Sequence, residues 1–264
     1  MRALLIRGMI TGLVAAAVGL LVAWIYGEPQ VAHAIAFEES HAGAHEHGEE
    51  VVSRTVQRTA GLVTAMAVYG AAIGGLFSVV FAFAQGRLAS VSGPLGARAT
   101  AALVASLGFV AVVLVPALKY PPTPPAVGDP GTIGGRTSLY FGMVALGVLG
   151  TVAAVIVYGR LLPRLGTWNA ATVAAVGFVV VVAGVFRLTP RPDAIPEGFP
   201  GTVLWDFRIA SLGTQLALWA TLGLLFGYLT ERASGGAGRS LRTSPRQAAP
   251  GSTGSSYAGR THPG

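Results

Sequence analysis

The sequence has no cysteine and only one lysine, Lys119. Without cysteine the chain has no disulfides, no thiolate metal sites and no thiol catalysis. The phosphate-binding motif of nucleotide hydrolases requires serine or threonine after its lysine, and Lys119 is followed by Tyr120. The HExxH, GxSxG and strand-linked GxGxxG motifs are also missing. We therefore predict that the chain is not an enzyme.

Charged residues are scarce for a chain of this length. They make up 11% of the 264 residues, hydrophobic residues make up 52%, and the mean hydropathy is +0.62. A soluble domain carries roughly 25% charged residues to cover its surface. The net charge is +7, but the basic residues are spread over the ends of apolar stretches and do not form one cluster. We predict an integral membrane protein that contacts lipid and binds no nucleic acid.

A helix needs roughly 20 apolar residues to cross the hydrocarbon core of a bilayer. Six stretches reach or approach this length: residues 3–26, 59–84, 100–118, 139–158, 170–186 and 209–229. We predict an all-α integral membrane protein in which residues 1–230 form a bundle of about six transmembrane helices. Residues 231–264 are mainly Gly, Ser, Pro, Ala and Arg, and are predicted to form a disordered cytoplasmic tail.

The first apolar stretch has two interpretations. Residues 32–34 read Ala-His-Ala, a signal-peptidase pattern that follows a charged start and an apolar run. The run covers residues 8–26, however, and is longer than the roughly 7 to 15 residues of a signal core. We expect a retained membrane helix, with a cleaved signal peptide as the alternative.

Glycine is abundant, with 37 residues in the chain. Three pairs have the Gly-x-x-x-Gly spacing that lets helix backbones approach closely in a membrane. They are Gly8 with Gly12, Gly70 with Gly74, and Gly223 with Gly227. We predict that each pair contacts another helix.

The distribution of basic residues predicts the orientation of the chain. Cytoplasmic loops are enriched in Lys and Arg. If six spans alternate, 11 basic residues fall on the side of both termini and 7 on the opposite side. We predict a multi-pass protein of the plasma membrane with both termini in the cytoplasm. The connections 27–58, 119–138 and 187–208 then face outward.

The first outer connection, residues 27–58, is rich in His and Glu. Residues 28–50 include four of the five histidines and six of the eleven acidic residues. Imidazole and carboxylate groups bind divalent cobalt, nickel, copper and zinc, and the order of affinities does not favour cobalt. We predict a metal site formed by His41, His45, His47, Glu46, Glu49 and Glu50. The alternative is a flexible, solvated acidic loop without a metal.

Polar residues near the outer ends of the spans suggest a route for a cation. Asp129 and Asp206 lie in or beside the second and third outer connections, and Gln215 lies in the last span. We predict that these three residues line a permeation path. For Asp206 the favoured interpretation is a structural ion pair with Arg208 or Arg58, and the place in a permeation path is the other. The six spans contain no ionisable residue at mid-span of the kind that pumps use, so the chain shows no energy source of its own.

Three groups of residues resemble the CbtA family of predicted cobalt transporter subunits. The first is the His/Glu stretch 41–50 followed by Ser-Arg-Thr-Val-Gln-Arg-Thr at 53–59. The second is Pro-Ala-Leu-Lys-Tyr-Pro-Pro at 116–122 with Gly-Asp-Pro at 128–130, and the third is Trp-Asp-Phe-Arg-Ile-Ala-Ser at 205–211 with Gly-Thr-Gln at 213–215. The resemblance covers residues 1–230. It implies a cobalamin-associated cobalt-uptake subunit that works with a small single-span, His-bearing partner, CbtB, and a metal-contact role for His41, His45 and His47.

Our leading hypothesis is therefore an integral membrane subunit of a divalent-metal uptake transporter. Cobalt is the expected ion, nickel and zinc are alternatives, and no resident cofactor is expected. A homo-oligomer is compatible with the sequence. The alternative function is a non-transporting membrane scaffold or metal sensor that docks a partner subunit.

Overall fold

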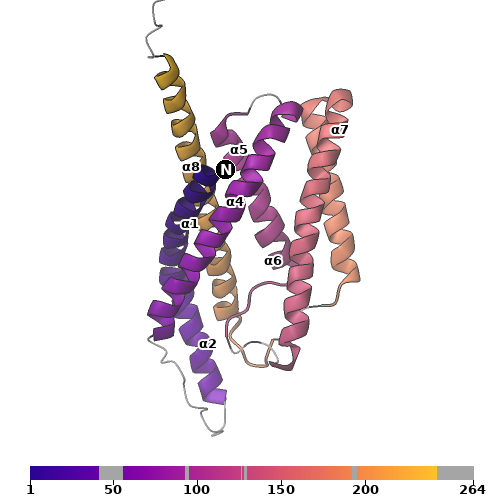
Figure 1. Cartoon of the computed structure of the whole chain (residues 1–264). Helices are drawn as coiled ribbons and strands as arrows, with labels where there is room; N and C mark the ends of the chain where they lie inside the picture. Colours follow the sequence, from indigo (N-terminus) through magenta and orange to yellow (C-terminus); the bar gives the residue numbers. More distant parts are fainter. Residues whose placement is uncertain (42–55, 93–94, 126, 128–129, 192–194, 243–264) are drawn as a thin grey trace, which may run out of the picture.

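The computed structural model of the chain describes residues 1–41, 56–92, 95–125, 127, 130–191 and 195–242 (Figure 1). This described part is helical and contains no strand. Five of its helices are long and apolar enough to cross a membrane. Large apolar side chains cover their outer surfaces, as at Leu149 (69% exposed) and Leu224 (68% exposed). Such a surface is compatible with lipid and not with water.

The first helix continues well beyond the predicted span. It consists of α1 (Arg2–Val22), the π-helical segment η1 (Ala23–Gly27) and α2 (Glu28–His41). Pro29 has no N–H, and its ring crowds the carbonyl four residues earlier, which normally ends a helix. Here the backbone widens before the proline, and the N–H of Glu28 bonds to the carbonyl of Ala23 five residues back. The first part of the predicted 27–58 connection is therefore helical.

α2 is held against the loops that precede α7 and α8. Ala34 is fully buried with Val127, Phe199 and Leu204. The rings of Phe37 and Phe199 pack edge to face with their centroids 5.1 Å apart. This cluster lies at one end of the molecule, which we call the α2 end.

α1 and α4 cross at two pairs of glycines. The π-helical segment η2 (Gln57–Gly61) leads into α4 (Leu62–Ser92). A methyl group on Gly12 would overlap the carbonyl of Gly70, and one on Gly74 would overlap the carbonyl of Gly8. The two predicted Gly-x-x-x-Gly pairs therefore face each other, which confirms that they seat a neighbouring helix.

A second close contact joins α5 to the last helix. α5 (Ala97–Phe109) continues through the π-helical segment η3 (Val110–Leu114) into α6 (Val115–Lys119), and α8 spans Gly201–Arg242. Gly223 and Gly227 pack against Ala105, Ala101 and Arg98 of α5, as the third pair predicted. The aromatic core next to this contact contains Phe77, Phe81, Trp219 and Phe226. α8 also continues past Glu231 into the segment that was predicted to be disordered.

The long helix α7 (Ile133–Leu188) folds back on itself. A short 3-10 turn, η4 (Pro130–Thr132), precedes it. Gly166 has φ 72° and ψ 172° inside α7, a conformation that breaks the helix, and Pro163 lies just before it. The two legs run side by side in Figure 1, and a methyl group on Gly150 would lie 3.0 Å from the ring of Phe178 on the other leg. The predicted spans 139–158 and 170–186 lie on separate legs.

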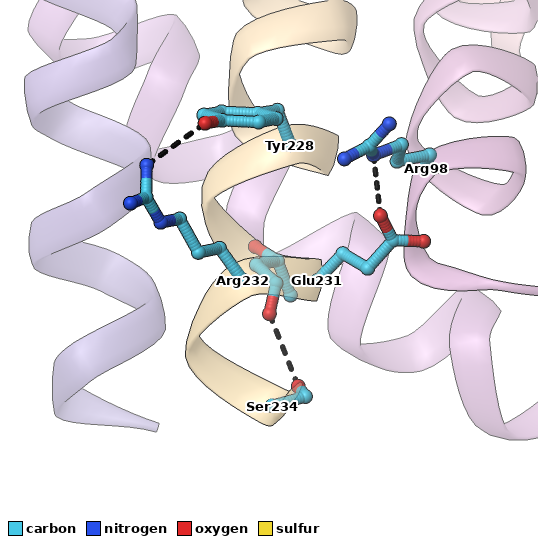
Figure 2. A network of polar contacts seen from close by, with 6 residues as sticks. Arg98, Tyr228, Glu231, Arg232 and Ser234 are labelled. Carbon is cyan, nitrogen blue, oxygen red and sulfur yellow. Dashed lines mark hydrogen bonds and ion pairs between the residues drawn. The ribbon is translucent and has the colours of Figure 1, made fainter. Parts of the chain in front are cut away.

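The N-terminus and the far half of α8 lie together at the end opposite α2 (Figure 1). Arg7 donates to the Thr230 hydroxyl over 3.4 Å. Figure 2 shows Arg98 of α5 paired with Glu231 of α8, while Arg232 donates to the Tyr228 hydroxyl over 2.9 Å. The guanidinium of Arg98 also lies over the Tyr228 ring. Arginine and tyrosine concentrate in this way at a membrane boundary.

Lys119 connects the end of α6 with the end of α7 through hydrogen bonds. Its ammonium donates to the carbonyls of Phe186 and Thr189 over 2.7 and 3.2 Å. A cation at a helix C-terminus is also favoured by the helix dipole. We expect Lys119→Met to lower the free energy of unfolding by roughly 2 kcal/mol, because charge-assisted bonds are lost. The midpoint of thermal unfolding in detergent should fall by roughly 5 °C.

The control for Lys119→Met is Arg160→Met, which removes an exposed cation from α7. An equal effect of both variants would show that general charge loss, and not the Lys119 contact, stabilises the α7 hairpin.

Candidate functional site

A cavity of about 310 Å³ opens near the α2 end of the bundle. Its wall includes residues of η1, α2, α4, η3, α6, α7 and α8. Most lining side chains are small or apolar, such as Ala23, Val31 and Ala117. The polar lining residues are Glu28, Tyr140, Ser211, Thr214 and Gln215. The cavity therefore combines an apolar wall with a few oxygen-bearing groups, as ligand sites commonly do.

Two of the three π-helical segments contribute to this wall. Ala23 and Gly27 come from η1, and Val113 comes from η3. Each segment precedes a proline, Pro29 or Pro116, that cannot donate to the carbonyl one turn earlier. π-helical turns inside α-helices often occur at functional sites. The prolines thus reshape both helices where they border the cavity.

One face of α8 provides most of the polar wall. Ser211, Thr214 and Gln215 are spaced three and four residues apart, so they lie on the same side of the helix. The Tyr69 hydroxyl of α4 donates to Oε1 of Gln215 over 3.4 Å. The Thr214 hydroxyl donates to the carbonyl of Ala210 over 2.9 Å, which leaves its oxygen able to accept. The amide and the hydroxyl are therefore held in place by neighbouring groups.

Glu28 is the acidic residue of the cavity wall, and sequence reasoning missed it. Its side chain is buried, with 8% exposed. From the sequence, Glu28 was expected in the outer connection 27–58, because the first span was predicted to end at residue 26. The run of helix-forming residues after Pro29 is the signal that would have extended the helix past Glu28.

The structure brings only part of the predicted site together. Gln215 lines the cavity, as the permeation-path prediction requires. Asp206 is exposed on α8, and within the described part of the chain it forms no ion pair with Arg208. Among the described residues, the Nε atom of Arg208 is buried and has no hydrogen-bond partner. Asp206 does not line the cavity.

The predicted metal ligands lie mostly outside the described residues. His41 ends α2, while Glu46, Glu49 and Glu50, with His45, His47 and Asp129, are not described. Among the residues that are described, no three His, Cys, Asp or Glu side chains come together in a group that could hold a metal ion. The metal site of residues 41–50 stays a prediction.

A family model described as "Probable cobalt transporter subunit (CbtA)" matches residues 1–231. The chain belongs to the CbtA family. The match extends from the start of α1 into α8 and includes every residue that lines the cavity. Neither curated proteins nor solved structures gave a match.

CbtA membership confirms the resemblance found in the sequence. Together with five helices apolar enough to cross a membrane, it identifies a membrane protein of cobalt transport. The word subunit in the family description implies a partner subunit. Transporter subunits are generally not enzymes, in agreement with the missing catalytic motifs.

Proposed function

We propose that this CbtA family member is the integral membrane subunit of a divalent-metal uptake transporter and that its ion is cobalt. The observation that carries the proposal is the family match over residues 1–231. In this function the His/Glu segment captures the ion outside the cell through His41, His45 and His47, with Glu46, Glu49 and Glu50 as further ligands. A small single-span, His-bearing protein of the CbtB type is the proposed partner, and a homo-oligomer is the alternative assembly.

In the proposed arrangement the chain crosses the membrane six times, with both termini in the cytoplasm. The fold of α7 supports this number. Its 56 residues would extend about 84 Å as one straight helix at about 1.5 Å per residue. That length far exceeds a hydrocarbon core of about 30 Å, whereas each leg of the hairpin matches one crossing. The excess of 11 basic residues over 7 supports the orientation.

In the proposed path the captured ion passes from residues 41–50 to the cavity beside Gln215. The course of α2 supports this route, because the helix begins in the cavity wall and ends at His41. Asp129 and Asp206 are proposed to attract the cation before it reaches the cavity, and the exposed carboxylate of Asp206 does so without desolvation.

Cobalt uptake by cells tests the role of the His/Glu segment. In the triple variant His41→Ala/His45→Ala/His47→Ala, uptake at limiting Co²⁺ should fall by about tenfold or more. A loss of roughly 1.4 kcal/mol in capture free energy is enough for that change. Uptake at saturating Co²⁺ should change much less, because capture no longer limits it. His33→Ala is the control, since His33 is exposed on α2. Equal uptake by parent and triple variant at limiting Co²⁺ removes the segment from the mechanism.

Reconstituted vesicles separate the transporter from a non-transporting scaffold or metal sensor. Accumulation of Co²⁺ by vesicles that contain the purified chain, alone or with its partner subunit, supports transport. Binding of Co²⁺ without accumulation in either preparation supports the scaffold or sensor.

A further inference from the structure

We infer that the cavity at the α2 end is a second cation site, in which the Glu28 carboxylate and the Gln215 amide oxygen hold a partly hydrated divalent ion. The inference rests on the proposed function in taking the cargo to be a divalent cation. Of the residues that line the cavity, Glu28 carries the negative charge, and Ser211, Thr214 and Gln215 carry neutral oxygens.

The position of Glu28 along the membrane normal allows its carboxylate to stay charged. Glu28 follows Arg7 by 21 residues along a continuous helix, a rise of about 32 Å. Gln215 precedes Arg232 by 17 residues on α8, a rise of about 26 Å. If Arg7 and Arg232 mark one boundary of a core about 30 Å thick, Glu28 lies at the other boundary and Gln215 slightly inside it. The site then has the position of a vestibule that water can enter.

The size of the cavity fits an ion that keeps most of its water. A volume of about 310 Å³ holds about ten waters at roughly 30 Å³ each. Removing all water from a dication in apolar surroundings would cost tens of kcal/mol by order of magnitude. A hydrated ion needs only one or two direct protein ligands, and waters reach the remaining oxygens. One carboxylate and one amide are therefore sufficient.

The arrangement around Gln215 is suited to a cation. The amide oxygen has two lone pairs, and the Tyr69 hydroxyl occupies one of them. This bond points the oxygen side of the amide to a fixed position and leaves the second lone pair for an ion or its water.

The ligand chemistry predicts weak selectivity. The cavity wall has oxygen donors and no imidazole or thiol among its lining residues. Oxygen sites suit Mg²⁺ and Mn²⁺ as well as Co²⁺. The Glu28 site therefore receives an ion that other groups have selected, and it should bind several dications with affinities that follow the general order Mn²⁺ < Co²⁺ < Ni²⁺.

Mn²⁺ binding to the purified full-length chain tests the site. The experiment uses a background in which His41, His45 and His47 are changed to Ala and Glu46, Glu49 and Glu50 to Gln, so that the His/Glu segment contributes little, and it follows free Mn²⁺ by electron paramagnetic resonance. Glu28→Gln should weaken Mn²⁺ binding by about tenfold or more, because a direct ligand and its charge are lost. Glu38→Gln, an exposed acid on the same helix, is the matched control and should bind as the background does.

Gln215→Glu provides a test that does not depend on the stability of the Glu28 variant. The new carboxylate can still accept from Tyr69 and brings a second charge to the cavity. It should tighten Mn²⁺ binding by about tenfold, because cation affinity rises with the number of charged ligands. Unchanged affinity in Gln215→Glu, or equal weakening by Glu28→Gln and Glu38→Gln, would overturn the site.

Binding and flux are measured separately, so the two proposals fail separately. If parent vesicles accumulate Co²⁺ while neither cavity variant changes Mn²⁺ affinity, the Glu28 site is wrong and the transport function stands. If the variants change Mn²⁺ affinity as expected but parent vesicles accumulate no Co²⁺ with or without the partner subunit, the site stands and belongs to a scaffold or sensor.

Discussion

Gly12→Leu is expected to abolish accumulation of the folded protein in the membrane, whereas Gly177→Leu leaves it unchanged. A side chain at residue 12 would overlap the carbonyl of Gly70 and approach the Cα of Gly74. Both are backbone atoms of α4 and cannot rotate aside. Extra methylene groups in a packed core cost roughly 1–3 kcal/mol even where side chains can adjust, so the cost here should exceed that range. At Gly177 an added Cβ would meet no atom within 4 Å.

Alanine substitutions at three glycines should show that the loss of stability depends on how closely the neighbouring helix approaches. Gly12→Ala should lower the thermal unfolding midpoint in detergent, because its methyl group already overlaps Gly70. Gly19→Ala should have a small effect, because its nearest neighbour is the flexible end of Met66 at 3.1 Å. Gly177→Ala should be neutral or slightly stabilising, since alanine favours helix over glycine by roughly 1 kcal/mol. If Gly12→Leu accumulates and unfolds as the parent does, α1 and α4 do not cross at these glycines.

The membrane character of the fold could be predicted because its signals are local. A run of apolar residues must satisfy its own backbone hydrogen bonds in lipid, so length and hydropathy indicate a spanning helix without knowledge of its neighbours. The Gly-x-x-x-Gly spacing places both glycines on one helix face. The sequence could therefore predict that Gly8 and Gly12 contact a helix, but it could not predict that Gly70 and Gly74 are their partners.

Helix ends were predicted less well. The first apolar stretch was predicted to end at residue 26, whereas the helix widens into η1 and continues to His41. The cluster of Ala34 and Phe37 with Phe199 helps to stabilise this extension. That contact joins residues more than 150 positions apart, so local sequence patterns cannot predict it.

The same missed extension explains what was overlooked at the candidate site. Gln215 was selected because it is polar within an apolar span, and it does line the cavity. Glu28 was assigned to a loop, so its burial beside α8 was not foreseen. Asp206 is only nine residues from Gln215 but lies on an exposed part of α8. Helical position relative to neighbours, and not residue type, decides which polar groups reach the cavity.

Single cysteines should report the six-crossing arrangement in an all-or-none manner. The chain contains no cysteine, so each introduced thiol gives an unambiguous signal. Ser40→Cys at the end of α2 and Leu188→Cys at the end of α7 should react with a membrane-impermeant maleimide in intact cells. Thr167→Cys beside the Gly166 turn and Ser234→Cys on α8 should react only after the cells are permeabilised. All four positions are exposed in the structure, so burial does not limit the reaction.

Thr167→Cys decides the number of crossings, because it lies between the two legs of α7. If it reacts in intact cells together with Leu188→Cys, the hairpin does not cross the membrane and the chain spans it four times. If Leu188→Cys reacts only after permeabilisation while Ser234→Cys reacts in intact cells, α7 crosses once. A complete reversal of the expected pattern places α2 and the His/Glu segment in the cytoplasm. Capture of external cobalt by that segment would then be impossible, because no ion could reach it before crossing the membrane.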